Sequence, residues 1–327
     1  MSAFKPGLFK TVIMATLMFG VGAHAESSYP NRSITVVVPF AAGGEVDTAA
    51  RLVAERLGGA LGQAVIIQNR VGASGTIGMA YVARAKPDGY TLGWGSSSAL
   101  ASSPYLYKDP GYDPIKSFRP INMATSSAWV LLVAKSSPIK SVADLVRTGK
   151  AAPGKLTYAS AGINSNPDLI GKLFTHAAAF TARDIPYKGG IESSTAVMAN
   201  QVDFTFDAIA SHDAESLNGS NLRAIAVTSQ TRSRALPDVP TLAESGLPTL
   251  TMVTFNGLVA PIATPPEVVQ KLDEAMRVTM NDPALRAKIS RTGNEPMGRG
   301  SQEFAATIAQ QTALWQSAIK LAGAHPQ

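Results

Sequence analysis

The chain contains no cysteine among its 327 residues. This absence excludes disulfide bonds, thiol chemistry and a lipid anchor attached to cysteine. The 29 Lys and Arg residues, set against 23 Asp and Glu, are scattered and form no basic tract interleaved with aromatic residues. Nucleic acid is therefore not an expected partner.

Long apolar runs are also missing, because no segment after the N-terminus approaches the roughly 20 apolar residues that a transmembrane helix needs. At the N-terminus, Lys5 and Lys10 precede a short apolar stretch, and Ala23-His24-Ala25 has the small-x-small form of a signal-peptidase site. We expect a signal peptide over residues 1–25 and export to the periplasm. Its removal leaves 27 basic against 23 acidic residues, a mild net charge of +4.

The segment that follows reads as strand, tight loop and helix start. Ile34–Val38 is apolar and β-branched, as in a buried strand, and Gly43 with Gly44 forms a turn before a helix expected from Glu45. Unpaired N–H groups at a helix start favour an anion such as a carboxylate or phosphate, although such turns also occur merely to reverse the chain. We expect ligand contacts at Phe40, Ala41, Ala42, Gly43 and Gly44.

Sequence patterns for nucleotide binding and catalysis are missing. The loop lacks Gly-x-Gly-x-x-Gly, and no Lys-Ser or Lys-Thr follows it. Ser160 has Tyr158 two residues earlier, where a Gly-x-Ser-x-Gly nucleophile elbow needs Gly. After signal removal only His176, His212 and His325 remain, and no His, Asp and Glu cluster has metal-ligand spacing. A surface role is favoured for His176, late in an expected helix. We expect no catalytic residue, no metal and no cofactor.

The remaining chain alternates strand and helix signals, which predicts a mainly parallel α/β sheet. Loops rich in Gly or hydroxyl groups follow the expected strands 34–38, 64–67, 90–94 and 156–159. Ligands bind at the carboxyl ends of such strands. Asp207 follows another expected strand. It is either a residue of the site or a residue that only forms the turn after the strand. The site residues expected from these loops are Ser74, Ser96, Ser97, Ser160, Gly162, Ser165 and Asp207.

Extended runs at 121–125 and 129–134 indicate a first crossing between two lobes near residues 125–128. The extended run at 250–255 predicts a second, return crossing. Helix signals at 266–280, 283–291 and 302–321 are too many for the second lobe alone, so we assign them to the first. We expect residues 26–126 and 256–327 to form lobe 1 and residues 127–255 to form lobe 2. A double crossing gives a hinge, with the ligand in the cleft between the lobes.

Four motifs in order resemble a known family. They are Pro39-Phe40-x-x-Gly43-Gly44-x-x-Asp47-x-x-x-Arg51, Gly72-x-x-Gly75-x-Ile77-Gly78, Pro87-Asp88-Gly89-Tyr90-Thr91-Leu92 and Pro186-Tyr187-Lys188-Gly189. The run Leu-Pro-Asp-Val-Pro-Thr-Leu-Ala-Glu at 236–244 resembles a further motif of that family. Over essentially the whole mature chain, the sequence resembles the extracytoplasmic receptors of tripartite tricarboxylate transporters, the Bordetella uptake gene (Bug) family.

This resemblance implies a type II periplasmic-binding-protein fold, in which two α/β lobes joined by two crossing strands enclose a ligand cleft. It implies a small organic acid as ligand, a mono- or dicarboxylate, aromatic acids included, and the permease subunits of a tripartite tricarboxylate-type transporter as partners of a monomeric receptor. The first loop would hold the carboxylate by backbone N–H groups, hydroxyls and water. A sensor module, or an enzyme on the same fold, is the alternative.

Several positions depart from the family pattern, namely Glu45, Ser74, Asp168 and Ser103. Glu45 occupies a place that is usually small or hydroxylated. We expect its side chain to point to solvent. In the cleft it would instead repel a second carboxylate, or pair with a ligand amine or ring nitrogen. Asp47 and Arg51, four positions apart, are expected to form a structural pair behind the loop.

Overall fold

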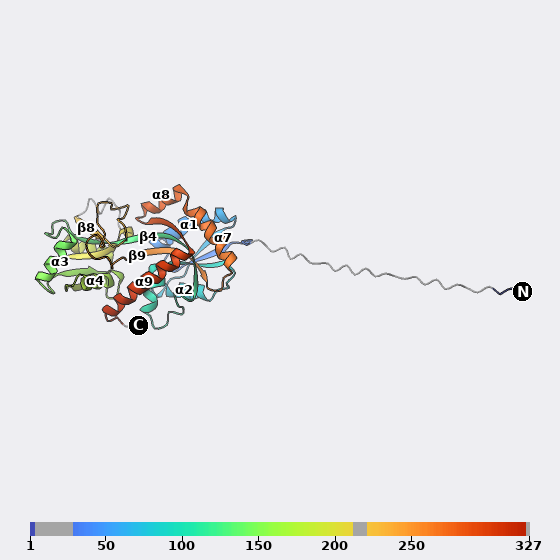
Figure 1. The fold of residues 1–327 in the computed structure, drawn as a ribbon, viewed down its shortest axis with the longest axis horizontal. Helices are drawn as coiled ribbons and strands as arrows, with labels where there is room; N and C mark the ends of the chain where they lie inside the picture. Colours follow the sequence, from blue (N-terminus) through green and yellow to red (C-terminus); the bar gives the residue numbers. More distant parts are fainter. Residues whose placement is uncertain (4–28, 212–220, 325–327) are drawn as a thin grey trace.

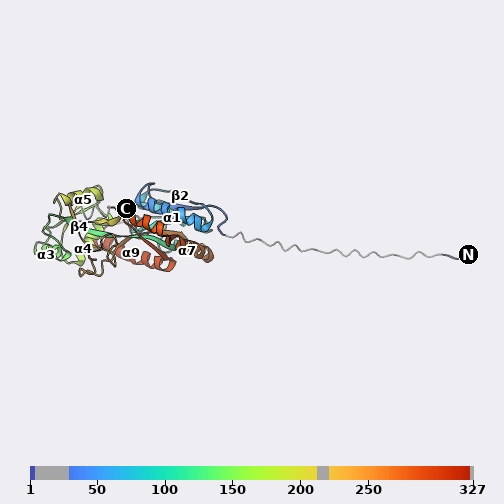
Figure 2. The ribbon, with the colours of Figure 1, turned by 90° about the horizontal axis from the view of Figure 1, so that it is seen from above.

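The computed structural model describes residues 1–3, 29–211 and 221–324. They form an α/β protein of two lobes, which Figure 1 shows side by side and Figure 2 shows from above. Nearly all of the expected signal peptide lies outside the described residues. No helix in the described ranges has the length and apolar character needed to cross a membrane.

Ten strands in the described part of the chain form one continuous sheet. In sheet order they are β2 (Val65–Asn69), β1 (Ile34–Val38), β3 (Thr91–Ser96), β9 (Val253–Pro261), β4 (Phe118–Ala134), β7 (Phe204–Ala208), β5 (Thr157–Ser160) and β6 (Arg183–Pro186), while β8 (Leu222–Val227) and β10 (Glu295–Gly300) pair with β4. The pairs of β1 with β2 and β3, and of β5 with β6 and β7, are parallel, as the alternating signals predict.

Helices cover this sheet and pack on its buried apolar residues. They are α1 (Glu45–Leu61), α2 (Thr76–Ala83), α3 (Val142–Ala151), α4 (Asn166–Ala177), α5 (Gly190–Met198), α7 (Pro266–Met280), α8 (Pro283–Arg291) and α9 (Ser301–Leu321). Ser141 caps α3 by accepting a hydrogen bond from the Asp144 N–H, as its position before Val142 predicts. The predicted bounds of β1, α7 and α8 agree with the structure at both ends.

The strand β4 joins the lobes as one strand of 17 residues, where the sequence predicted two separate runs at 121–125 and 129–134. As far as Ala128 it pairs with β9, and from Trp129 onward it pairs with β7 and β8. The return strand β9 begins at Val253, later than the predicted 250. We propose that the lobes divide where β4 changes partners.

Helix α9, which the sequence analysis assigns to the first lobe, has contacts in both lobes. It packs on β4 and also against α4 of the second lobe, as Figure 1 illustrates. On its buried face, the side-chain amide of Gln311 donates to the Thr251 carbonyl at 3.2 Å and accepts from the Val253 N–H at 3.1 Å. Helix α9 therefore holds the return crossing in place.

Candidate functional site

A cleft of about 710 Å³ lies between the loops of the two lobes. The first lobe contributes Ser74, Ser98, Ser102, Ser103 and Leu106. The second lobe supplies Trp129, Ala161, Asn164, Ser165, Asn166, Pro167, Gly190, Ile191, Ser194, Thr195, Met198, Asp207, Ala208 and Leu222. Among the described residues that line the cleft, none is Lys, Arg or His, so an anion bound there would be held by dipoles and hydroxyl groups.

The loop after β1 is shaped by Asp47, which is 1% exposed. Its Oδ2 accepts from the Gly43 N–H and from Arg51 Nε, each at 2.8 Å, and its Oδ1 accepts from Asn69 Nδ2 at 2.8 Å. The same Asn69 amide donates to the Phe40 carbonyl at 2.9 Å. Gly43 has a φ of +81°, a conformation that favours glycine. These bonds fix the path of the loop from Phe40 to Gly44.

The predicted pair of Asp47 and Arg51 is confirmed, and Asp47 does more than pair. Burial by itself would raise the pKa of Asp47, but hydrogen bonds from Arg51, Asn69 and the Gly43 N–H outweigh it and lower the pKa below its usual value. Asp47 is thus ionised throughout the neutral range. Its charge strengthens the hydrogen bonds that fix the path of the loop from Phe40 to Gly44.

The loop after β5 is held in the same way, by hydrogen bonds to the carboxylate of Asp168, which is fully buried. Its Oδ2 accepts from the Asn164 N–H and from Lys172 Nζ, each at 2.8 Å, and its Oδ1 accepts from the Tyr158 hydroxyl at 2.9 Å. In both lobes the acid therefore binds a backbone N–H four positions earlier and a cation four positions later. Asp168, which departs from the family pattern, has a structural role here.

The predicted site residues fall into two groups. Ser74, Ser165 and Asp207 line the cleft, and Gly162 belongs to the lining loop but is not itself a lining residue. Residues 40–44 are not among the lining residues; Phe40 contacts the loop that carries Ser74, since a Cβ built on Gly75 would lie 3.2 Å from Phe40 Cζ.

The other predicted serines are buried beneath the lining. The Ser96 hydroxyl accepts from the Ala99 N–H at 3.2 Å, and Ser160 Oγ donates to the Gly162 carbonyl at 3.3 Å. Ser97 is only 5% exposed. In this structure Ser96 and Ser160 shape the loops that carry the lining residues.

Asp207 lies at the end of β7 against the first residue of α5. Its Oδ2 accepts from Ser194 Oγ at 3.2 Å, and its Oδ1 accepts from the Ala208 N–H at 2.8 Å. Gly190 allows this approach, because a Cβ there would lie 3.0 Å from Asp207 Oδ2. The helix N-terminus favours the carboxylate at this place.

Sequence reasoning missed the apolar part of the lining, which includes Trp129, Ile191, Met198 and Leu222. Apolar residues in strands and helices are typical of a core, so the sequence gives no sign that these face a cleft. The additional serines were detectable, because Ser98, Ser102 and Ser103 continue the hydroxyl-rich segment that begins at Ser96. Trp129 is 6% exposed, and its indole N–H has no partner among the described residues.

Glu45 is exposed, in line with the expectation, and its carboxylate is also held by two side-chain amides. Its Oε1 accepts from Asn294 Nδ2 at 2.9 Å and from Asn256 Nδ2 at 3.5 Å. Protein atoms crowd the carboxylate, and this partial burial raises the pKa of Glu45, opposed by the bond from Asn294. Glu45 therefore lies in an open recess beside the crossing strand β9, where its carboxylate contacts Asn256 and Asn294.

The His, Asp and Glu side chains of the described residues could hold a metal ion only where several of them cluster. No group of three or more His, Asp or Glu among them could hold a metal ion. His176 is exposed in the last turn of α4, consistent with the surface role predicted for it. The other two histidines after residue 25, His212 and His325, lie outside the described residues.

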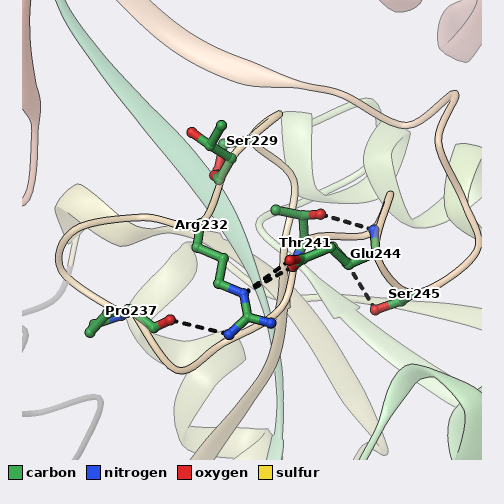
Figure 3. Close-up of polar contacts among 7 residues, drawn as sticks. Ser229, Arg232, Pro237, Thr241, Glu244 and Ser245 are labelled. Carbon is green, nitrogen blue, oxygen red and sulfur yellow. Dashed lines mark hydrogen bonds and ion pairs between the residues drawn. The ribbon is translucent and has the colours of Figure 1, made fainter.

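The motif at 236–244 folds into a turn, and none of its residues lines the cleft. Figure 3 shows the polar contacts that hold this turn. Arg232 Nε binds the Glu244 carboxylate at 3.0 Å. The Thr241 N–H donates to Glu244 Oε2 at 2.7 Å, and the Glu244 N–H donates to Thr241 Oγ1 at 3.0 Å. Because the two residues satisfy each other's backbone groups, the motif has a structural explanation.

Comparison with known proteins places this fold and cleft in a family. A family model described as "Tripartite tricarboxylate transporter family receptor" matches residues 49–324. BugT of Bordetella pertussis is 30% identical over 318 residues, covering 96% of each chain. The structure of the periplasmic binding protein BugD has 34% identity and a TM-score of 0.69, covering 91% of this chain and 100% of that one.

A second solved structure, an R. palustris protein with adipate, has 32% identity and a TM-score of 0.73, and covers 91% of this chain and 100% of that one. The two lobes joined by β4 and β9 are the type II periplasmic-binding-protein fold that the resemblance implied. The chain belongs to the tripartite tricarboxylate transporter receptor family.

Proposed function

We propose that this protein is a periplasmic receptor that captures a small organic carboxylate in the cleft between its lobes. The observation that carries the proposal is the cleft, which has a volume of about 710 Å³ and is lined from both lobes by hydroxyl groups and loop backbone. Clefts of this size take small molecules and fix them with a few polar groups. The R. palustris relative with adipate supports an organic acid as the ligand class.

The carboxylate would be bound without a cationic side chain. The start of α4 lies at the cleft, where Ser165, Asn166 and Pro167 line it, so the positive end of that helix dipole favours an anion there. We propose the same role for the loop that precedes α1. Asp47 and Asp168 hold these loops in shape before the ligand arrives, which reduces the entropy lost on binding. We propose contacts with the carboxylate at residues 40–44, Ser74 and Ser165.

A thermal-shift screen of organic acids tests this function. A ligand present at 100 times its Kd should add about 2.7 kcal/mol to the free energy of unfolding. We expect at least one small carboxylate to raise the melting temperature saturably, and its uncharged amide to have no effect. If no carboxylate raises the melting temperature, the proposal is wrong. Conversion of the bound acid during overnight incubation would instead point to an enzyme.

We further propose delivery to the permease subunits of a tripartite tricarboxylate-type transporter, by a monomeric receptor exported with the signal peptide 1–25. Membership of the receptor family supports this partner. The test is capture of the permease from membranes by the ligand-bound protein. Capture of a signalling protein in place of the permease would favour a sensor.

A further inference from the structure

Glu45 is the first residue of α1 and directly follows Gly44 of the loop proposed to hold the carboxylate. Its side chain is fixed by two buried amides, because Asn294 and Asn256 are each 2% exposed and both donate to its Oε1. A carboxylate held by two such donors is not a freely moving surface group. It has a defined place in the first lobe.

That place is next to the strands that join the lobes, beside the cleft, because neither Glu45 nor the two asparagines are among the lining residues. Asn256 pairs with Ser96 in the register of β9 with β3, and with Thr125 in the register of β9 with β4. Its amide also donates to the Thr125 hydroxyl at 3.3 Å. Glu45 therefore lies between the first loop and the carboxyl end of β3, where the segment with Ser97 and Ser98 begins.

The surroundings of Glu45 offer many acceptors and few donors. Both of its hydrogen bonds reach Oε1, so Oε2 accepts none from the described residues. The Oδ1 atoms of Asn256 and Asn294 also lack a partner among the described residues. The groups that bind Glu45 are neutral amides, and no described cation is paired with it. No described residue thus compensates its negative charge in this open recess.

A ligand that enters the cleft with its carboxylate on the first loop brings its other groups near this charge. A second carboxylate would be repelled, and an alkyl group would leave the charge unpaired. A protonated amine would supply both the donors and the positive charge that the recess lacks. We propose that Glu45 is the specificity-determining residue of the cleft and selects an amino-carboxylate. This proposal rests on the carboxylate-binding function proposed above.

Calorimetric titration with matched probes tests the selection. For chains of four, five and six carbons, the probes are the straight-chain monocarboxylate, the corresponding dicarboxylate, and the α- and ω-amino acids of the same length. We expect the best amino acid to bind about tenfold more tightly than its matched monocarboxylate and dicarboxylate, as for one hydrogen bond between charged groups. We also expect Glu45→Gln to remove this tenfold preference and to change monocarboxylate affinity less than twofold.

The control is Glu55→Gln, which removes an exposed carboxylate from the same helix outside the cleft and should leave every affinity unchanged. The wild-type ranking of probes needs no variant, so it tests the inference even if Glu45→Gln folds poorly. If monocarboxylates bind but dicarboxylates match or exceed the amino acids, or if Glu45→Gln keeps the preference, the inference is wrong and the function stands. If no probe binds, the inference is wrong, and the proposed function fails as well only if the thermal-shift screen also finds no carboxylate.

Discussion

At the scale of single residues, two buried aspartates show how the site keeps its shape without a ligand. Asp47 and Asp168 each accept a loop N–H and a cation at 2.8 Å. The sequence could predict the pair of Asp47 with Arg51, because helical spacing brings them together. It could not predict the bonds to Asn69 or Tyr158, whose side chains come from neighbouring strands. The contact of Glu45 with Asn294 spans 249 positions and is likewise a product of the fold.

We predict that Asp47→Asn lowers the free energy of unfolding by about 2 kcal/mol at pH 7, the scale of hydrogen bonds to a charged group. The folded pKa of Asp47 lies below its unfolded value, so its ionisation stabilises the fold above about pH 4. This contribution is lost as the pH falls through the folded pKa. The stability difference between wild type and Asp47→Asn should therefore shrink toward pH 3.

Urea denaturation at pH 7 and at pH 3 measures this difference. Glu55→Gln, an exposed change on the same helix, should stay within about 0.5 kcal/mol of wild type at both values. A difference between wild type and Asp47→Asn that is equal at both pH values would show that the charge of Asp47 does not stabilise the loop.

At the scale of elements, buried strands and amphipathic helices could be predicted from their patterns, while atypical strands could not. β6 and β10 were missed because Arg183–Pro186 and Glu295–Gly300 contain charged residues, Pro or Gly and few β-branched residues. The middle of β4 was not recognised because Ser126 and Ser127 interrupt its apolar run. These segments are extended because they pair with neighbouring strands. The secondary-structure preferences of their own residues do not favour a strand.

Helix α4 depends on a close approach at Gly171, where an added Cβ would lie 2.5 Å from Tyr158 Cε2. We predict that Gly171→Ala displaces the Tyr158 ring, weakens its bond to Asp168 and lowers the free energy of unfolding by about 1–3 kcal/mol. Chemical denaturation gives this value. Gly59→Ala in α1 is the matched control, because nothing lies within 4 Å of its added Cβ. It should be neutral or stabilising by up to about 1 kcal/mol, and a similar result for Gly171→Ala would refute the steric argument.

At the scale of the whole molecule, the two crossing strands β4 and β9 place two loop systems opposite each other. Serine residues and Asp207 could be located in advance, because they follow strands whose carboxyl ends meet. The apolar lining could not, since only the folded arrangement shows that Trp129 and Ile191 border the cleft rather than the core. The central claim is that a small organic acid binds between these two loop systems.

Fluorescence titration tests this claim most directly, because Trp129 lines the cleft while Trp94 and Trp315 are buried at 1% and 0% exposure and do not line it. An acid that raises the melting temperature should change the tryptophan emission saturably, with the Kd found by calorimetry. In Trp129→Phe, the emission change should disappear while calorimetry still detects binding. An unchanged wild-type emission, or a change that persists in Trp129→Phe, would contradict binding of the acid in this cleft.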